Sequence, residues 1–445
     1  MAREDTMPMH RRQVLGLALA APALLRVPPA LAADRADVSR KVLLTWHKLV
    51  LELVRHTATY VPPVAARAFA YVGITAHEAL SSGNPALRSL AGQLSDLAPL
   101  PARASGVHDE ACVLHGALQA VVGELFANTG PTGLRAMQAM GRKMGETAST
   151  GIDGAVVARS VAHGEAIAER ILAWAAADGG AVIENMGFPM NYTPGTRPQD
   201  WVPTNLIRLQ QAPLLPGWSN CRPFALPSSD ACDAPPHPDY DEAPGSAFHD
   251  AALEVYETSR NLTQDQKLIA RFWSDDPMLT PTPAGHWISI VLQIADRDSL
   301  PAEAISATLA KLGVAQADAF ISCWSTKFRY NLLRPVTYIN RHIDPSWEPF
   351  LITPPFPEYT SGHSTQSGAA MTVLTSVLGE GFAFDDATHE DEGLPVRSFP
   401  SFAAAAEEAA MSRLYGGIHF RFGNERGLDQ GRAVGAYAAA LKTEA

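Results

Sequence analysis

The chain is poor in cysteine, has no excess of positive charge, and shows no long apolar run after its N-terminal segment. It has four cysteines among 445 residues, and none of their spacings resembles a zinc or iron–sulfur site. Its formal net charge is −11, which argues against nucleic-acid binding through a general basic surface. The N-terminal apolar stretch is too short to span a bilayer and no other segment is long and apolar enough, so we expect no transmembrane segment in the mature chain. An acidic protein that binds an anion must instead gather its positive charge in one place.

The four cysteines are not expected to do chemistry. Cys112 and Cys323 lie in apolar stretches of helical character, where a buried thiol is common. Cys221 and Cys232 share one loop, and in an oxidising compartment they are equally consistent with a disulfide and with two thiols.

Residues 1–32 have the layout of a secretory signal. Arg11 and Arg12 precede an apolar stretch from Val14 to Leu25, and Ala30-Leu31-Ala32 offers a small-residue cleavage site. The paired arginines favour the twin-arginine type, and the alternative is a disordered basic N-terminus. Removing this segment removes four arginines and two acids, so the charge of the mature chain falls by two to −13. We therefore expect a bacterial protein that is exported, either periplasmic or extracellular.

The hydrophobic pattern is helical along most of the mature chain. Leu43, Trp46, Val50 and Leu53 recur at three- and four-residue spacing, as on one face of an amphipathic helix. Alternating strand patterns are scarce, so the predicted fold class is all-α, a multi-helix bundle. Similar stretches predict further helices at about 64–82, 106–127, 131–147, 153–177, 246–260, 264–274, 284–296, 302–340, 363–378, 402–414 and 425–441.

The helical pattern is interrupted between about 180 and 245. This stretch holds twelve of the 34 prolines, together with Trp201 and Trp218. A structureless linker of this length would be unusual inside a domain, so we expect an ordered excursion packed on the helices; a flexible hinge is the alternative. The predicted organisation is a helical half at 33–180, the excursion at 181–245, and a second helical half at 246–445.

Three polar segments of the second half carry the candidate chemistry. The first runs from Lys327 to Arg334-Pro335, and Lys327 and Arg334 are seven residues apart, which would place them on one face of a helix. Their apolar neighbours favour burial over a solvated face. Buried cations need an anion, so this segment predicts an anion site.

The second and third segments place histidines beside predicted helix ends. Prolines followed by the Thr-Ser-Gly-His sequence that ends at His363 indicate a loop entering a helix N-terminus, where free N–H groups attract anions. In the third segment, Arg413 precedes a glycine pair that ends a helix, and His419 follows. Taken singly, an N-cap hydroxyl and a structural histidine explain these residues equally well. Together the segments supply cations, a hydroxyl, a backbone N–H and two imidazoles, which is what a tetrahedral oxyanion needs.

In this order and spacing, the segments resemble the superfamily of vanadium-dependent haloperoxidases and type-2 phosphatidic acid phosphatases. Its motif is Lys-x6-Arg-Pro, then Pro-Ser-Gly-His, then Ser-Arg-x5-His-x3-Asp. The stretch from Lys327 to Pro335 matches the first part, and that from Ser412 to His419 matches the third. Ser361 to His363 matches the second part, with Thr360 in place of the proline. The motifs span about 327–423, and the helical character of the remaining chain agrees with this family more weakly.

The resemblance implies a role for each matching residue. His419 would bond vanadium, or be the phosphorylated nucleophile of a phosphatase, and His363 would be the general acid/base. Lys327 would be catalytic as well, by polarising the bound peroxide. The implied cofactor is vanadate, with phosphate as the ligand in the alternative. Besides His419, five residues would neutralise it or donate hydrogen bonds to it: Lys327, Arg334, Ser361, Gly362 and Arg413.

One position departs from the motif. The Asp that would orient the vanadium-binding imidazole, four residues after His419, is Gly423 here. Asn424, Glu425 or a distant Asp would have to replace it, or the site would be weaker.

Other segments are weaker candidates. Trp273 to Asp276 and Gly285 to Trp287 resemble parts of bacterial members of this family and would lie at the rim of the pocket. His286 itself is better explained as a core histidine with satisfied nitrogens. The acidic run from Asp385 to Glu392 lacks the spacing of a calcium loop, so a solvated loop is expected there.

Two enzymes fit such a pocket, and the haloperoxidase is the one we expect. It would use vanadate and hydrogen peroxide to oxidise a halide, which then reacts with a small organic substrate. An acid phosphatase would instead form a phosphohistidine at His419. The length of the chain and its long N-terminal helical half favour the first, and Phe356 beside the second motif would offer an apolar wall for a halide. A non-catalytic oxyanion-binding protein is a third alternative, and the oligomeric state, a homodimer included, is left open.

Overall fold

Apolar residues at helical spacing form α-helices along most of the chain. The computed structural model describes residues 29–184, 187–189, 191–204 and 212–445, so nearly all of the predicted signal segment lies outside the described residues. Within them the structure has fourteen α-helices and one two-stranded antiparallel sheet, which confirms the predicted all-α class. The first six helices are α1 Pro29–Arg55, α2 Pro62–Ser81, α3 Glu110–Leu125, α4 Gly130–Ser149, α5 Gly154–Ala176 and α6 Gly180–Glu184. The others are α7 Ala247–Arg260, α8 Gln264–Phe272, α9 Thr282–Arg297, α10 Ala302–Tyr330, α11 Pro335–His342, α12 Gly362–Leu378, α13 Phe402–Tyr415 and α14 Arg421–Ala439.

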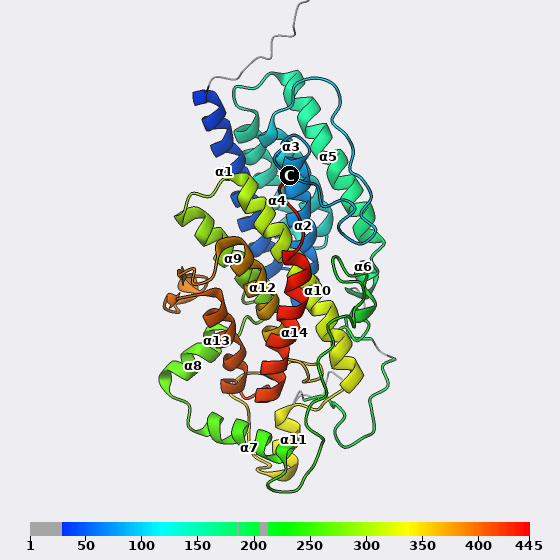
Figure 1. Cartoon of the computed structure of the whole chain (residues 1–445), viewed down its shortest axis with the longest axis vertical. Coiled ribbons are helices and arrows are strands. Elements are labelled where there is room, and N and C mark those ends of the chain that lie inside the picture. The colour runs from blue at the N-terminus through cyan, green and yellow to red at the C-terminus, as the bar shows by residue number, and fades with distance from the viewer. Residues whose placement is uncertain (1–28, 185–186, 190, 205–211) are drawn as a thin grey trace, which may run out of the picture.

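Helix α2 joins the two helical halves by packing closely against α10. Small residues permit this approach: a Cβ on Gly73 would lie 2.8 Å from the carbonyl oxygen of Leu309, and one on Gly313 would lie 2.7 Å from Cα of Ala70. In Figure 1, α1 to α5 occupy one end of the molecule and α7 and α11 the other. The two halves share a large core cluster, and a smaller one lies mainly within the second half. The predicted division into three regions stays a prediction.

Helix α10 is buried in the core and ends just before the candidate site. By length and composition alone it is long and apolar enough to cross a membrane, which the sequence analysis did not expect. However, 83% of its apolar window is buried inside the protein, as in a core helix. It ends at Tyr330 because Asn331 adopts the left-handed conformation (φ 51°), and Pro335 then begins α11. The single helix predicted at 302–340 is therefore wrong, and two helices stand in its place.

The described residues of the proline-rich excursion lie against the second helical half. The backbone N–H of Trp201 donates to the carbonyl oxygen of Asn331 (2.7 Å), and that of Leu214 donates to Pro355 (2.8 Å). The carboxylate of Asp318 on α10 accepts three further backbone N–H groups, at 2.7, 2.7 and 3.0 Å, from Phe224, Ala225 and Leu226. These contacts argue for an ordered excursion over a flexible hinge.

All four cysteines are buried. Cys112 and Cys323 are thiols, as expected, and the structure has no disulfide between Cys221 and Cys232. The Sγ of Cys323 lies 3.5 Å from the carbonyl oxygen of Thr360, so this thiol packs beneath the second motif.

Helices α12 and α14 hold the motif loops in a fixed relation. A Cβ on Gly431 of α14 would lie 2.0 Å from the carbonyl oxygen of Thr365 on α12, so the two backbones are in direct contact. Between α12 and α13, strand β1 (Phe384–Asp386) pairs antiparallel with β2 (Arg397–Phe399), with Phe384 opposite Phe399. This ribbon holds the acidic run of the sequence against α9.

Candidate functional site

The three polar segments meet at one cavity of about 250 Å³. Of the predicted site residues, Gly362, His363, Arg413 and His419 line this cavity. The other three are fully buried behind its wall: Lys327, Arg334 and Ser361. Much of the remaining wall is apolar and includes Phe320, Trp324, Leu351 and Phe356. The sequence segments are thus brought together as the motifs predicted.

His419 is held at both ring nitrogens. It lies in the turn between α13 and α14, after Gly417, whose positive φ of 75° forms the turn. Its Nδ1 lies 2.8 Å from Oε1 of Glu358, and a carboxylate there requires the proton on Nδ1. Its Nε2 lies 3.0 Å from Nη1 of Arg334 and therefore accepts a hydrogen bond. This neutral tautomer keeps one lone pair on Nε2, and a metal or phosphorus atom bonded there would take the place of the Arg334 N–H.

Glu358 takes the place of the missing Asp and was not predicted as a site residue. A Cβ on Gly423 would lie 2.2 Å from Oε1 of Glu358, so the carboxylate fills the space that a side chain at 423 would occupy. The same oxygen accepts the backbone N–H of Phe420 at 3.0 Å. Of the expected substitutes, Asn424 contacts a serine of α12 instead, and Glu425 is exposed. A glycine in the Asp position was the one signal in the sequence that a carboxylate had to come from elsewhere.

Lys327 fastens the loop that carries Glu358. Its ammonium group donates to three backbone carbonyl oxygens, those of Pro357 (2.8 Å), Glu358 (2.9 Å) and Thr360 (2.5 Å). The ammonium nitrogen also lies 5.1 Å from the ring centre of Phe356. The three acceptors match the three N–H groups of Lys327, so none is left for a ligand in the cavity. Lys327 therefore acts on the cavity through its positive charge and through the loop that it holds.

Arg334 connects this loop to His419. It is the N-cap residue of α11, so it does not share a helix face with Lys327 as predicted; the turn after Asn331 brings both side chains to one wall. Its Nε donates to the carbonyl oxygen of Phe356 at 2.8 Å, while Nη1 contacts His419. Its Nη2 is buried and has no hydrogen-bond partner. Such a donor is costly to leave unpaired, and an anion in the cavity would satisfy it.

Arg413 is fixed by the end of α8. Its Nη2 donates to the carbonyl oxygens of Ala270 (3.3 Å) and Trp273 (2.5 Å), where the helix dipole favours a cation. Its Nε donates to Oγ of Ser412 at 2.9 Å. The Ser-Arg pair of the third motif therefore sets the direction of one guanidinium group.

Lys327, Arg334 and Arg413 are buried with too few carboxylates nearby to balance their charge, and burial disfavours the charged form of each side chain. Burial is the main reason why the pKa of Lys327 falls to about 7, that of Arg334 to about 9 and that of Arg413 to about 10. Burial also raises the pKa of Glu358 to about 7, against the opposing effect of Lys327 and Arg334. An oxyanion in the cavity would favour the charged form of every cation around it.

His363 is the partly exposed acid/base candidate at the start of α12. The helix begins at Gly362, and its N-cap Ser361 accepts the N–H of Ser364 at 3.4 Å, which confirms the predicted loop entering a helix N-terminus. The side chain of His363 is 16% exposed, and its Nε2 has no hydrogen-bond partner and lies 4.0 Å from Oδ2 of Asp275. Burial and the charge of Arg413 hold the pKa of His363 well below 6.5, so the ring is neutral at neutral pH.

The weaker candidates of the sequence have mixed outcomes. Asp275 and Asp276 line the cavity, as expected for a rim segment. His286 is fully buried with its two ring nitrogens facing Asp275 and Asp386, so the expected core histidine is confirmed.

The prediction of a solvated loop at 385–392 is wrong for two residues. Asp386 is 0% exposed and His389 is 1% exposed. Strand β1 explains the first, because alternation along it exposes Asp385 and buries its neighbours on either side.

Comparison with known proteins finds relatives along nearly the whole chain. The family described as the VCPO second helical-bundle domain matches residues 307–345 and 340–444, which contain all three motifs. Among solved structures, a bacterial vanadium-dependent iodoperoxidase is 36% identical, with 91% of this chain and 97% of that chain covered at a TM-score of 0.82. A bacterial vanadium-dependent chloroperoxidase is 16% identical over 86% of this chain and 93% of that chain, at a TM-score of 0.66, and supports the fold alone. A vanadium-dependent bromoperoxidase from Ascophyllum nodosum is 33% identical over 94 residues, which span 18% of this chain and only 17% of that enzyme.

Proposed function

This chain belongs to the vanadium-dependent haloperoxidase family, and we propose that it oxidises iodide with hydrogen peroxide at a vanadate bound to Nε2 of His419. The observation that carries the proposal is a set of three buried cations around a cavity lined by two neutral imidazoles. Iodide is proposed because the relative with 36% identity over 91% of the chain is an iodoperoxidase.

The residues present fit a tetrahedral oxyanion. Arg334 keeps a buried N–H group without a partner, and the start of α12 faces the cavity at Gly362. Arg413 lines the same cavity, and Lys327 adds a third positive charge behind it. The hydrogen bond from Nδ1 to Glu358 keeps Nε2 of His419 unprotonated, as a vanadium ligand must be.

When bound, vanadate supplies a Lewis acid that activates hydrogen peroxide towards attack by a halide. The net reaction joins hydrogen peroxide, iodide and one proton to give hypoiodous acid and water. His363 is placed to move that proton, because its ring lines the cavity and its Nε2 has no hydrogen-bond partner. The rings of Trp324 and Phe356 limit water in the cavity and offer a polarisable wall to iodide.

Vanadate-dependent turnover tests the proposal. Protein stripped of phosphate and metal is expected to oxidise iodide with hydrogen peroxide only after vanadate is added, as measured by triiodide absorbance. His419→Ala should abolish this gain, whereas His342→Ala, which changes a histidine that does not line the cavity, should retain it. Bromide and chloride measured in parallel define the halide range.

A phosphatase is the outcome that would overturn the proposal. The phosphate-free protein would then hydrolyse nitrophenyl phosphate, and vanadate would not produce oxidation of any halide. We also propose that a small organic molecule accepts the halogen, because hypohalous acid diffuses to its targets. Export through residues 1–32 is part of the same proposal, because the N-terminal sequence has the layout of a signal.

A further inference from the structure

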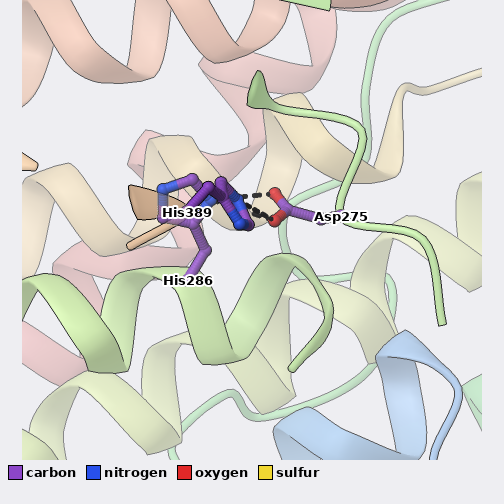
Figure 2. A group of neighbouring side chains, drawn as sticks. All are labelled: Asp275, His286 and His389. Carbon is purple, nitrogen blue, oxygen red and sulfur yellow. Dashed lines mark hydrogen bonds and ion pairs between the residues drawn. The ribbon is translucent and has the colours of Figure 1, made fainter. Parts of the chain in front are cut away.

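A second polar cluster lies behind His363, and the reaction proposed above does not use it. Asp275 follows α8, His286 belongs to α9, and His389 follows strand β1, so three distant segments meet there. Figure 2 shows the two imidazoles directed at the carboxylate of Asp275. All three side chains are at most 2% exposed, and their nearest ligand-type atoms lie within 4.8 Å of one another.

The inner nitrogens of both imidazoles face the same carboxylate. Nδ1 of His286 lies 3.0 Å from each oxygen of Asp275, and Nε2 of His389 lies 3.2 Å from one of them. Ligand atoms around a tetrahedral zinc ion, at bond lengths of about 2.0–2.1 Å, are separated by roughly 3.3 Å. The two imidazole–carboxylate separations are therefore close to those of a metal site, and the three ligand atoms together lie within 4.8 Å, so a bound ion would draw them closer.

The outer nitrogens face two further carboxylates. Nε2 of His286 lies 2.8 Å from Asp386, and Nδ1 of His389 lies 3.4 Å from Glu392. The carboxylate of Asp386 requires the proton on Nε2 of His286, which leaves Nδ1 as a lone-pair donor. Glu392 is placed to do the same for His389, whose Nδ1 makes no hydrogen bond in the structure. Histidines that bind metals show this arrangement, in which an outer carboxylate fixes the tautomer and the ring.

A divalent metal ion would balance the buried negative charge of this cluster. Asp275 and Asp386 carry two buried negative charges, and a divalent cation with two neutral imidazoles neutralises both. Two protons would give the same charge only as a pair of imidazolium rings, whose centres are 4.8 Å apart and which would repel each other. One imidazolium would balance one carboxylate and leave the second to the charge of Arg413, which acts on Asp275 from the oxyanion site.

The surroundings of the cluster suit a held cation. Trp273 stacks on His286 with ring centres 4.4 Å apart, and Phe272 contacts both imidazoles edge-on. Such an apolar shell strengthens electrostatic binding and limits exchange with water.

We propose that Asp275, His286 and His389 bind a divalent transition-metal cation of the zinc type, with Asp386 and Glu392 orienting the two histidines. Two imidazoles with one carboxylate favour zinc and its neighbours over calcium or magnesium, which prefer oxygen ligands. This site is distinct from the oxyanion site at His419. Its occupant would also fix Asp275 beside His363, since their side chains are 4.0 Å apart.

Metal analysis of the full-length protein tests the proposal. Protein purified without nickel resin or chelator is expected to hold about one divalent metal ion per chain. Stripped protein should take up one equivalent of Zn²⁺ in competition with a chromogenic chelator, and Co²⁺ should give a visible absorption band. His389→Gln should lower the zinc affinity by at least 10-fold, and Glu392→Gln, which removes an outer carboxylate, by about 10–100-fold. The matched control, His342→Gln, should bind like the wild type.

Two outcomes would overturn this inference. A folded wild-type protein that takes up neither Zn²⁺ nor Co²⁺ would show that protons alone hold the cluster together. Zinc lost in His419→Ala but kept in His389→Gln would place the ion in the oxyanion site. Circular dichroism of each variant separates loss of metal from loss of fold, and vanadate titration of the same samples reports on the proposed function independently.

Discussion

Glu358→Ala should weaken vanadate binding, because it removes the carboxylate that orients His419. The variant leaves Nδ1 of His419 and the N–H of Phe420 without the acceptor that they share at 2.8 and 3.0 Å. Losing an outer partner of a metal-binding histidine typically lowers affinity or activity about 10–100-fold, or roughly 1.4–2.8 kcal/mol. Vanadate affinity is measured by calorimetric titration of the stripped protein, and kcat/KM by iodide oxidation. Glu425→Ala, which removes an exposed carboxylate two residues after Gly423, is the control and should behave like the wild type.

A second substitution makes this reasoning sharper. Gly423→Asp alone should lower vanadate affinity, because the new Cβ would lie 2.2 Å from the Glu358 carboxylate. The new carboxylate would also add a second buried negative charge. Combined with Glu358→Ala, the same aspartate enters vacated space in the position that the motif prescribes, and vanadate affinity should recover by at least 10-fold over Glu358→Ala. If the double variant binds vanadate no better than Glu358→Ala, the carboxylate at 358 does not replace the one missing at 423. Wild-type affinity in Glu358→Ala would refute the orienting role itself.

His363→Ala should keep vanadate affinity while kcat for iodide oxidation falls about 10²–10⁴-fold. An unchanged kcat would show that His363 does not transfer the proton. Gly431→Ala forces a Cβ to within 2.0 Å of the Thr365 carbonyl and should destabilise the fold by about 1–3 kcal/mol in urea unfolding, whereas Gly154→Ala, where a Cβ meets no atom within 4 Å, should not. Burial lowers the pKa of His47 to about 4 from about 6.5 in the unfolded chain, so the unfolded state binds the proton first. The contribution of His47 to stability should therefore be full above pH 6.5, fall by up to about 3 kcal/mol as the pH drops to 4, and level off below. His47→Leu should reduce the loss of unfolding free energy between pH 7 and pH 4.5, measured by urea titration at each pH; an equal loss in both proteins would contradict the assignment.

Local signals predicted most of the helices. The stretch predicted at 402–414 is the helix Phe402–Tyr415, and that predicted at 246–260 is Ala247–Arg260, because amphipathic spacing and N-caps act over a few residues. The break at 331–334 was missed although its signal was present: the residue before Pro335 is disfavoured in the helical region. Apolar periodicity on both sides concealed the interruption.

The site was predictable as a set of motifs but not as a set of contacts. Spacing along the chain identified the two histidines, yet it placed Lys327 and Arg334 on one helix face, whereas a left-handed Asn331 separates them. The actual partners of Lys327 are carbonyl oxygens thirty or more positions away, and no local rule encodes such a pairing. Motif resemblance carries these distant contacts only because the fold that makes them is shared.

Two buried carboxylates that the sequence analysis did not predict, Glu358 and Asp386, follow one physical rule. Charged residues are assigned to the surface because burying an unpaired charge is costly, and Asp386 lies in an acidic stretch that looks solvated. The rule fails where a partner imidazole removes that cost: Glu358 meets His419 at 2.8 Å, and Asp386 meets His286 at 2.8 Å. The signals for burial were a glycine where the motif needs a carboxylate, and strand alternation that places Asp386 on the buried face with Phe384. The sequence neighbours of a buried carboxylate therefore say little about its burial. The better signal is a histidine elsewhere in the chain that needs a carboxylate to orient its ring.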